Sequence, residues 1–86
     1  MADKTRKILS SFAVFDSAEE GGYNVSFPDF PGCVTFGKTF EEAEKNAKEI
    51  LELWLEELAS QKQKIRVRTK GLIISEVRAA LPQKTF

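Results

Sequence analysis

The chain has 86 residues, of which 42% are hydrophobic and 30% are charged, and its formal net charge at pH 7 is zero. We expect one domain over residues 1–86, with a core from about residue 7 to residue 81. No apolar run approaches the roughly 20 residues that cross a bilayer, and the N-terminus lacks the pattern of a secretory signal. A single cysteine cannot form an intrachain disulfide, so a cytoplasmic location without a membrane partner is expected.

The first part of the chain predicts three short β-strands. Residues 7–15 are rich in β-forming side chains, residues 23–27 alternate between apolar and polar, and residues 33–36 form a third run. The polar segment 16–22 contains a Gly-Gly pair and predicts a turn between the first two strands. This pattern favours an antiparallel meander.

The segment 27–33, Phe-Pro-Asp-Phe-Pro-Gly-Cys, joins the second and third strands. Each proline fixes its own φ and disfavours helix at the preceding residue, so Phe27 and Phe30 are expected to be extended. Gly32 supplies a backbone conformation that a side chain would resist. We therefore expect a rigid loop that holds two aromatic rings in place.

One amphipathic helix is predicted after the strands. Thr39 and Glu42 have the spacing of a capping box at its start, and the helical pattern fades near Ser60. At 100° per residue, an apolar arc of about 100° would pack on the sheet; it consists of Phe40, Ala43, Ala47, Ile50, Leu51, Trp54 and Leu58. Trp54 is expected to be buried against the sheet, whereas Leu53 projects toward the acidic face of the helix.

The residues after the helix predict a fourth strand. Residues 72–81 have a spacing that suits a strand or a short helix. We favour a strand, because a three-stranded sheet covered by one helix has an edge to bury. The predicted fold is therefore α+β, in the order β-β-β-α-β, an antiparallel meander covered by one helix.

The residue types limit the chemistry. The chain has no histidine, which excludes Ser–His and Cys–His nucleophilic sites and histidine metal ligands. Cys33 is expected to be a packed apolar side chain, and no metal or other cofactor is expected. The candidate acids for a magnesium-dependent nuclease are Asp16, Glu19, Glu20 and Asp29. Most of them lie in a flexible turn, so we expect no enzymatic activity; a vestigial nuclease is the alternative.

These motifs together resemble the HicB family, the antitoxin half of a bacterial toxin–antitoxin pair. The resemblance covers about residues 7–60 and is carried by Glu-Glu-Gly-Gly-Tyr at 19–23, the segment 27–33, Gly-Lys-Thr-Phe at 37–40 and Leu-Trp-Leu at 53–55. It implies a truncated RNase H core without catalytic carboxylates. It also implies a protein that binds and masks a small ribonuclease toxin of the HicA type.

That toxin uses a histidine, so this chain is expected to be the antitoxin and not the toxin. Full-length HicB antitoxins carry a separate C-terminal DNA-binding module. The residues that follow Ser60 are too few for one, so no such domain is expected.

The expected function is thus a non-catalytic antitoxin that masks its toxin by protein–protein contact. Rigid aromatic rings and one loop acid are the expected partner-binding residues: Tyr23, Phe27, Asp29 and Phe30. The alternative is an RNA-binding or oligomeric interaction module that uses segment 64–70. The cations of this segment alternate onto one side: Lys64, Arg66, Arg68 and Lys70. Their nucleic-acid binding is expected to be weak and non-specific at most.

The charges are unevenly distributed along the chain. Residues 41–57 are mostly acidic, whereas the residues after 61 are mostly basic. Opposed patches, uncovered sheet edges and a small core all favour a homodimer or a higher homo-oligomer. The interface is expected near Leu53 or residues 72–74.

Overall fold

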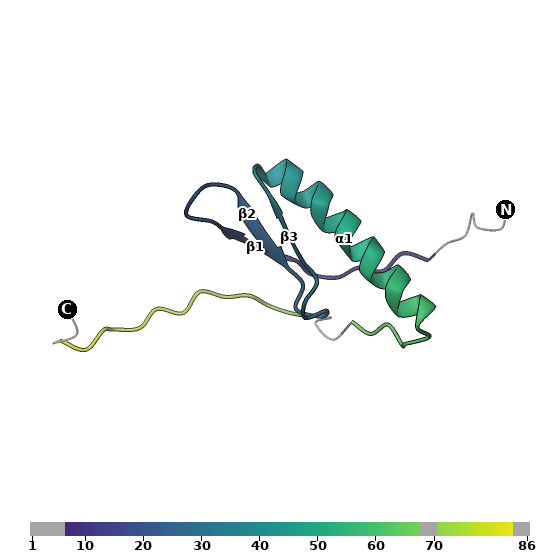
Figure 1. Cartoon of the computed structure of the whole chain (residues 1–86). Helices are drawn as coiled ribbons and strands as arrows, with labels where there is room; N and C mark the ends of the chain where they lie inside the picture. Colours follow the sequence, from purple (N-terminus) through teal and green to yellow (C-terminus); the bar gives the residue numbers. More distant parts are fainter. Residues whose placement is uncertain (1–6, 68–70, 84–86) are drawn as a thin grey trace.

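The computed structural model describes residues 7–67 and 71–83. Its elements are β1 (Val14–Ser17), β2 (Tyr23–Ser26), β3 (Val34–Gly37) and α1 (Phe40–Ser60). The strands form one antiparallel sheet in the order β1-β2-β3, and α1 covers one face of it (Figure 1). The predicted α+β architecture, a meander followed by one covering helix, is confirmed. Within the described residues, no helix is long and apolar enough to span a membrane.

The strand register separates the side chains onto two faces of the sheet. Val25 in β2 pairs with Phe15 in β1 and with Thr35 in β3, and these three side chains lie on the face that α1 covers. The opposite face, called the open face below, carries exposed side chains only: Val14, Asp16, Asn24, Ser26, Val34 and Phe36. The sheet is therefore covered on one side within the described chain.

The junction between β3 and α1 has the predicted capping box. Thr39 is extended and its Oγ1 accepts a hydrogen bond from the Glu42 backbone N–H at 3.1 Å. The Glu42 carboxylate accepts a second bond, at 2.8 Å, from the backbone N–H of Lys38, the residue before the N-cap. The helix ends at Ser60, as predicted, and Lys62 follows with a positive φ of 58°.

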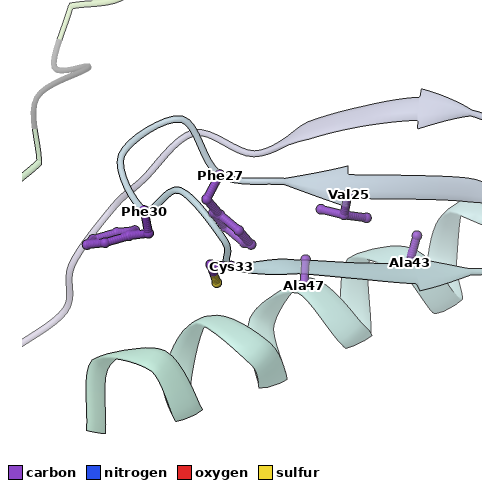
Figure 2. Packing of buried hydrophobic residues seen from close by; sticks show 6 residues of the cluster. All are labelled: Val25, Phe27, Phe30, Cys33, Ala43 and Ala47. Carbon is purple, nitrogen blue, oxygen red and sulfur yellow. The ribbon is translucent and has the colours of Figure 1, made fainter. Parts of the chain in front are cut away.

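The core lies between α1 and the covered face of the sheet. Its buried members are Val25, Phe27, Phe30, Cys33, Ala43 and Ala47 (Figure 2). Gly37 at the end of β3 lies directly against the first turn of α1, where a Cβ atom would overlap the backbone of Ala43. Because neither side of this contact carries a large side chain, the helix and the strand approach each other at close to backbone distance.

The remaining residues of the predicted apolar arc lie around this core. Four are half-buried against it: Ile50, Leu51, Trp54 and Leu58. Trp54 is thus less buried than predicted, because its ring reaches past the short sheet to the loop, where a Cβ on Gly32 would lie 3.2 Å from it. Phe40 is partly exposed, but its ring centroid lies 4.9 Å from that of Phe15. Leu53 is 60% exposed, in agreement with its predicted place off the arc.

The predicted fourth strand is absent from the described residues, so the order β-β-β-α-β is wrong in its last element. Residues 71–83 are exposed and belong to no strand or helix. They run away from α1 as an extended chain (Figure 1, yellow-green). A strand is defined by its pairing, and in the single chain no described strand accepts the backbone hydrogen bonds of this segment.

The first strand is also shorter than predicted. Residues 7–13 precede β1 without being assigned to it, and the paired residues begin at Val14. The pairing partner sets this limit, because β2 has only the residues Tyr23–Ser26 to offer.

Enlarging Ala43 tests the close contact between α1 and β3. Ala43→Leu places a branched side chain against Gly37, where there is no room for it. The overpacking should lower the free energy of unfolding by about 1–3 kcal/mol or more. The control is Ala59→Leu, on the exposed face of the same helix, with a change within about 0.5 kcal/mol. Urea unfolding followed by Trp54 fluorescence measures both, and equal effects would contradict the packing described.

The reactivity of Cys33 tests the order of the core. Its side chain is 1% exposed, and burial raises the pKa of the thiol. Because the thiolate is the reactive form, the folded protein should react with a thiol reagent at pH 8 at least about tenfold more slowly than the urea-unfolded chain. Equal rates in the folded and unfolded states would show that the core opens freely at this position.

Candidate functional site

The loop between β2 and β3 has an ordered backbone that contributes two side chains to the core. This proline loop comprises residues 27–33 and consists of two successive turns. The Phe30 N–H donates to the Phe27 carbonyl at 3.0 Å, and the Cys33 N–H donates to the Phe30 carbonyl at 2.9 Å. Gly32 has a φ of 96°, in the region that favours glycine. The turns fix the course of the loop before any partner is present.

Two of the predicted partner-binding residues, Phe27 and Phe30, anchor this loop to the core. Phe27 is 4% exposed and Phe30 is 5% exposed. Figure 2 shows the Phe27 ring pointing from the end of β2 toward α1, and both rings belong to the core. In the folded chain their rings are therefore not on the surface. Pro28, Pro31 and Gly32 form the exposed side of the loop.

Asp29 ties the proline loop to the segment before β1. It is half-buried, and its Oδ2 accepts a hydrogen bond from the Ser11 hydroxyl at 3.3 Å. This bond joins residues 18 positions apart in the sequence. Asp29 thus has a structural role in addition to any contact with a partner.

Tyr23, the fourth predicted partner-binding residue, lies at the other end of β2. Its ring meets the Phe40 ring edge-on, with centroids 5.9 Å apart. At about 3.3 Å per residue, Tyr23 is roughly 13 Å along the strand from Phe27. The structure therefore brings Phe27, Asp29 and Phe30 together in one loop and leaves Tyr23 apart from them.

The acidic residues considered for nuclease chemistry are distributed over separate places. Asp16 is in β1 on the open face, Glu19 and Glu20 are in the β1–β2 turn, and Asp29 is in the proline loop. Among residues 7–67 and 71–83, no three acidic or cysteine side chains are grouped so that they could hold a metal ion. The arrangement does not bring these acids together as a two-metal or acid–base site requires.

The predicted basic row is described only in part. Lys64 and Arg66 are exposed in a segment without strand or helix, whereas Arg68 and Lys70 lie outside the described residues. The acidic face of α1 is exposed, and an ion pair joins Lys48 to Glu52 on it at 3.9 Å. An exposed i,i+4 pair of this kind contributes little to stability.

The open face of the sheet is a partly apolar surface that includes none of the predicted binding residues. Val34 is 57% exposed and Phe36 is 43% exposed, and both lie in a shallow depression that also includes Asp16 and Asn24. The sequence did carry a signal for it, because Val34 and Phe36 alternate with Thr35 and Gly37 along β3. Apolar side chains at alternate positions indicate a second, separately oriented apolar surface.

Comparison with known proteins places the chain in a family. Residues 12–80 match the family described as the HicB-like antitoxin of bacterial toxin–antitoxin systems, a match that includes β1 to α1 and most of the segment after the helix. A UPF0150 protein of Synechocystis is 33% identical over 60 residues, which are 70% of this chain and 76% of the relative.

Two further relatives have the same UPF0150 designation. The protein of Thermotoga maritima is 44% identical over 52 residues, which are 60% of this chain and 68% of the relative. The protein of Thermoplasma acidophilum is 45% identical over 47 residues, or 55% of this chain and 68% of the relative. With a family match over most of its length, the chain belongs to the HicB-like antitoxin family.

Proposed function

We propose that this chain is a non-catalytic antitoxin that masks a small HicA-type ribonuclease toxin by protein–protein contact. Family membership supports an antitoxin role in general terms. The absence of histidine from the sequence and the separation of the acids support masking without catalysis by this chain. Because the toxin acts on RNA in the cell, this role belongs in the cytoplasm.

The proline loop is the observation that most directly supports a contact surface. Its two turns and its two buried phenylalanines hold Pro28 and Pro31 in fixed exposed positions. A surface that is already ordered loses little conformational entropy when a partner binds. In this proposal Phe27 and Phe30 act by supporting the loop, while Asp29 and the half-buried Tyr23 contribute contacts at its side and at the far end of β2.

A charge reversal in the loop tests the proposed contact. Asp29→Lys should weaken masking of a purified HicA-type toxin by about tenfold or more, because a half-buried charge of the wrong sign disrupts a complementary interface. Glu20→Lys is the control, since it makes the same change of charge in the exposed β1–β2 turn. Inhibition of RNA cleavage by the purified toxin, titrated with each variant, measures the effect.

Circular dichroism must show that Asp29→Lys is folded, because this residue also bonds Ser11. If the folded Asp29→Lys variant protects RNA as well as the Glu20→Lys variant does, the loop is not the contact surface. If the unmodified chain does not inhibit the toxin at all, the antitoxin proposal itself fails.

RNA binding through the basic segment is the second candidate function, supported by the exposure of Lys64 and Arg66. Backbone contacts of this kind neutralise phosphates and release counterions, so affinity should fall with salt by a log–log slope of about −0.7 for each contact to single-stranded RNA. A chain with no net charge should bind only weakly and without sequence preference.

Replacing both cations tests this candidate. The double variant Lys64→Ser, Arg66→Ser should flatten the salt slope by about 1.4, which is two contacts. Lys45→Ser with Lys48→Ser on α1 is the matched control, with the same loss of charge and no expected change. Fluorescence anisotropy with a short RNA measures the slopes, and sequence-specific binding at physiological salt would contradict the weak, non-specific mode.

A further inference from the structure

The segment after α1 has the composition of a sheet strand but no strand partner in the described chain. Ile73 and Val77 are each 85% exposed, and Leu81 is 65% exposed. The radius of gyration of the chain is 17.1 Å, compared with about 12 Å for a compact domain of this length. A soluble domain rarely leaves such a run of apolar side chains without a cover.

Residues 72–81, called the C-terminal arm below, alternate with the period of a strand. One side carries Ile73, Val77 and Leu81, with the small residues Ser75 and Ala79 between them. The other side carries Glu76 and Arg78 together with Leu72, Ile74 and Ala80. In an extended conformation the arm is thus uncharged on one face and mixed on the other, which suits a strand at the edge of a half-covered sheet.

The two edges of the sheet differ in their ability to accept a further strand. The C-terminal half of the β3 edge is taken up by α1, since the Asn46 side-chain amide donates to the Phe36 carbonyl at 2.8 Å and Gly37 lies against Ala43. No described residue makes such a bond to the outer edge of β1 (Val14–Ser17). The edge of β1 is therefore the one that can accept the arm.

The helix presents apolar side chains beside this free edge. The ring contact between Phe40 and Phe15 identifies the side of α1 that lies toward β1. At 100° per residue, Leu51 and Leu55 fall on the same side of the helix as Phe40. Both leucines are half-buried and Phe40 is 46% exposed. A strand beyond β1 would place its apolar side over these three residues.

We propose that the C-terminal arm of one copy pairs with β1 of a second copy. The arm of the second copy pairs with β1 of the first, so the two copies are related by a two-fold axis. Val67 and Gly71 lie with Ser10, Ser11 and Phe12 around a hollow of about 350 Å³, so the arm starts beside the chain that enters β1. From there it runs away from its own sheet, and the molecule reaches 64 Å in its longest dimension (Figure 1).

The arm is long enough to cover the whole edge of β1. Ten residues of extended chain span about 33 Å, so the arm is long enough to run along the four residues of β1 and part of the chain that precedes it. Reciprocal exchange covers both arms and both β1 edges at once, and exchange of an identical element is a low-cost route to a dimer. The chain has no net charge to oppose the association. This arrangement does not depend on the antitoxin function, so the two proposals can fail separately.

Two neighbouring variants of the full chain test the exchange. Val77→Lys puts a charge on the apolar side of the arm, whereas Ala80→Lys puts the same charge on its other side. Sedimentation of the unmodified chain at micromolar concentration should give a dimer. Val77→Lys should raise its dissociation constant at least about tenfold, and Ala80→Lys less than about threefold. Neither position contributes to the core, so the circular dichroism of the helix should not change.

The place of the arm is tested by hydrogen exchange and cross-linking. The amides of residues 72–81 should be protected in the dimer. A photoreactive phenylalanine analogue at position 80, in a mixture of isotopically light and heavy chains, should link the arm to β1 mainly between light and heavy copies. The proposal is overturned if the chain is a monomer or if the arms of the dimer are unprotected. It is also overturned if links form within single chains only, because the arm would then be folded onto its own sheet.

Discussion

The contact between the end of β3 and the first turn of α1 is the constraint on which the rest of the structure depends. Gly37 and Ala43 allow the helix to lie against the backbone of the strand. A sheet of three four-residue strands has little surface to bury, so only a closely seated helix can exclude water from Val25 and Cys33. The same contact sets the direction of α1, so that Trp54 in its second half lies against Gly32 of the proline loop.

The elements with strong local signals could be predicted from the sequence. The capping box at Thr39, the end of the helix near Ser60 and the exposed position of Leu53 depend on spacing within a single helix, and each agrees with the structure. The meander was predictable for the same reason, because alternation and turn residues act within a few positions. These are cases in which local preference and tertiary packing favour the same conformation.

The features that depend on distant partners could not be predicted in the same way. Residues 72–81 alternate like a strand, but pairing requires an edge that their own sequence does not specify. The burial of Phe27 follows from the alternation of β2, which places it on the side of Val25, whereas the burial of Phe30 depends on how the proline loop folds back on the core. A role of these two residues in partner binding stays a prediction. The bond between Ser11 and Asp29 had no signal at all, since hydroxyl and carboxylate side chains are common in loops.

The hydrogen bond from Asn46 to the Phe36 carbonyl has a consequence for the behaviour of the protein at high concentration. Open-ended fibril growth by strand addition requires two free edges on every subunit, one to join the preceding subunit and one to accept the next. With the Phe36 carbonyl already bonded by a side chain of its own helix, the β3 edge offers fewer backbone groups to an added strand than the β1 edge does. The Asn46 side chain thus removes one backbone acceptor from the β3 edge, which makes that edge a poorer template for an added strand.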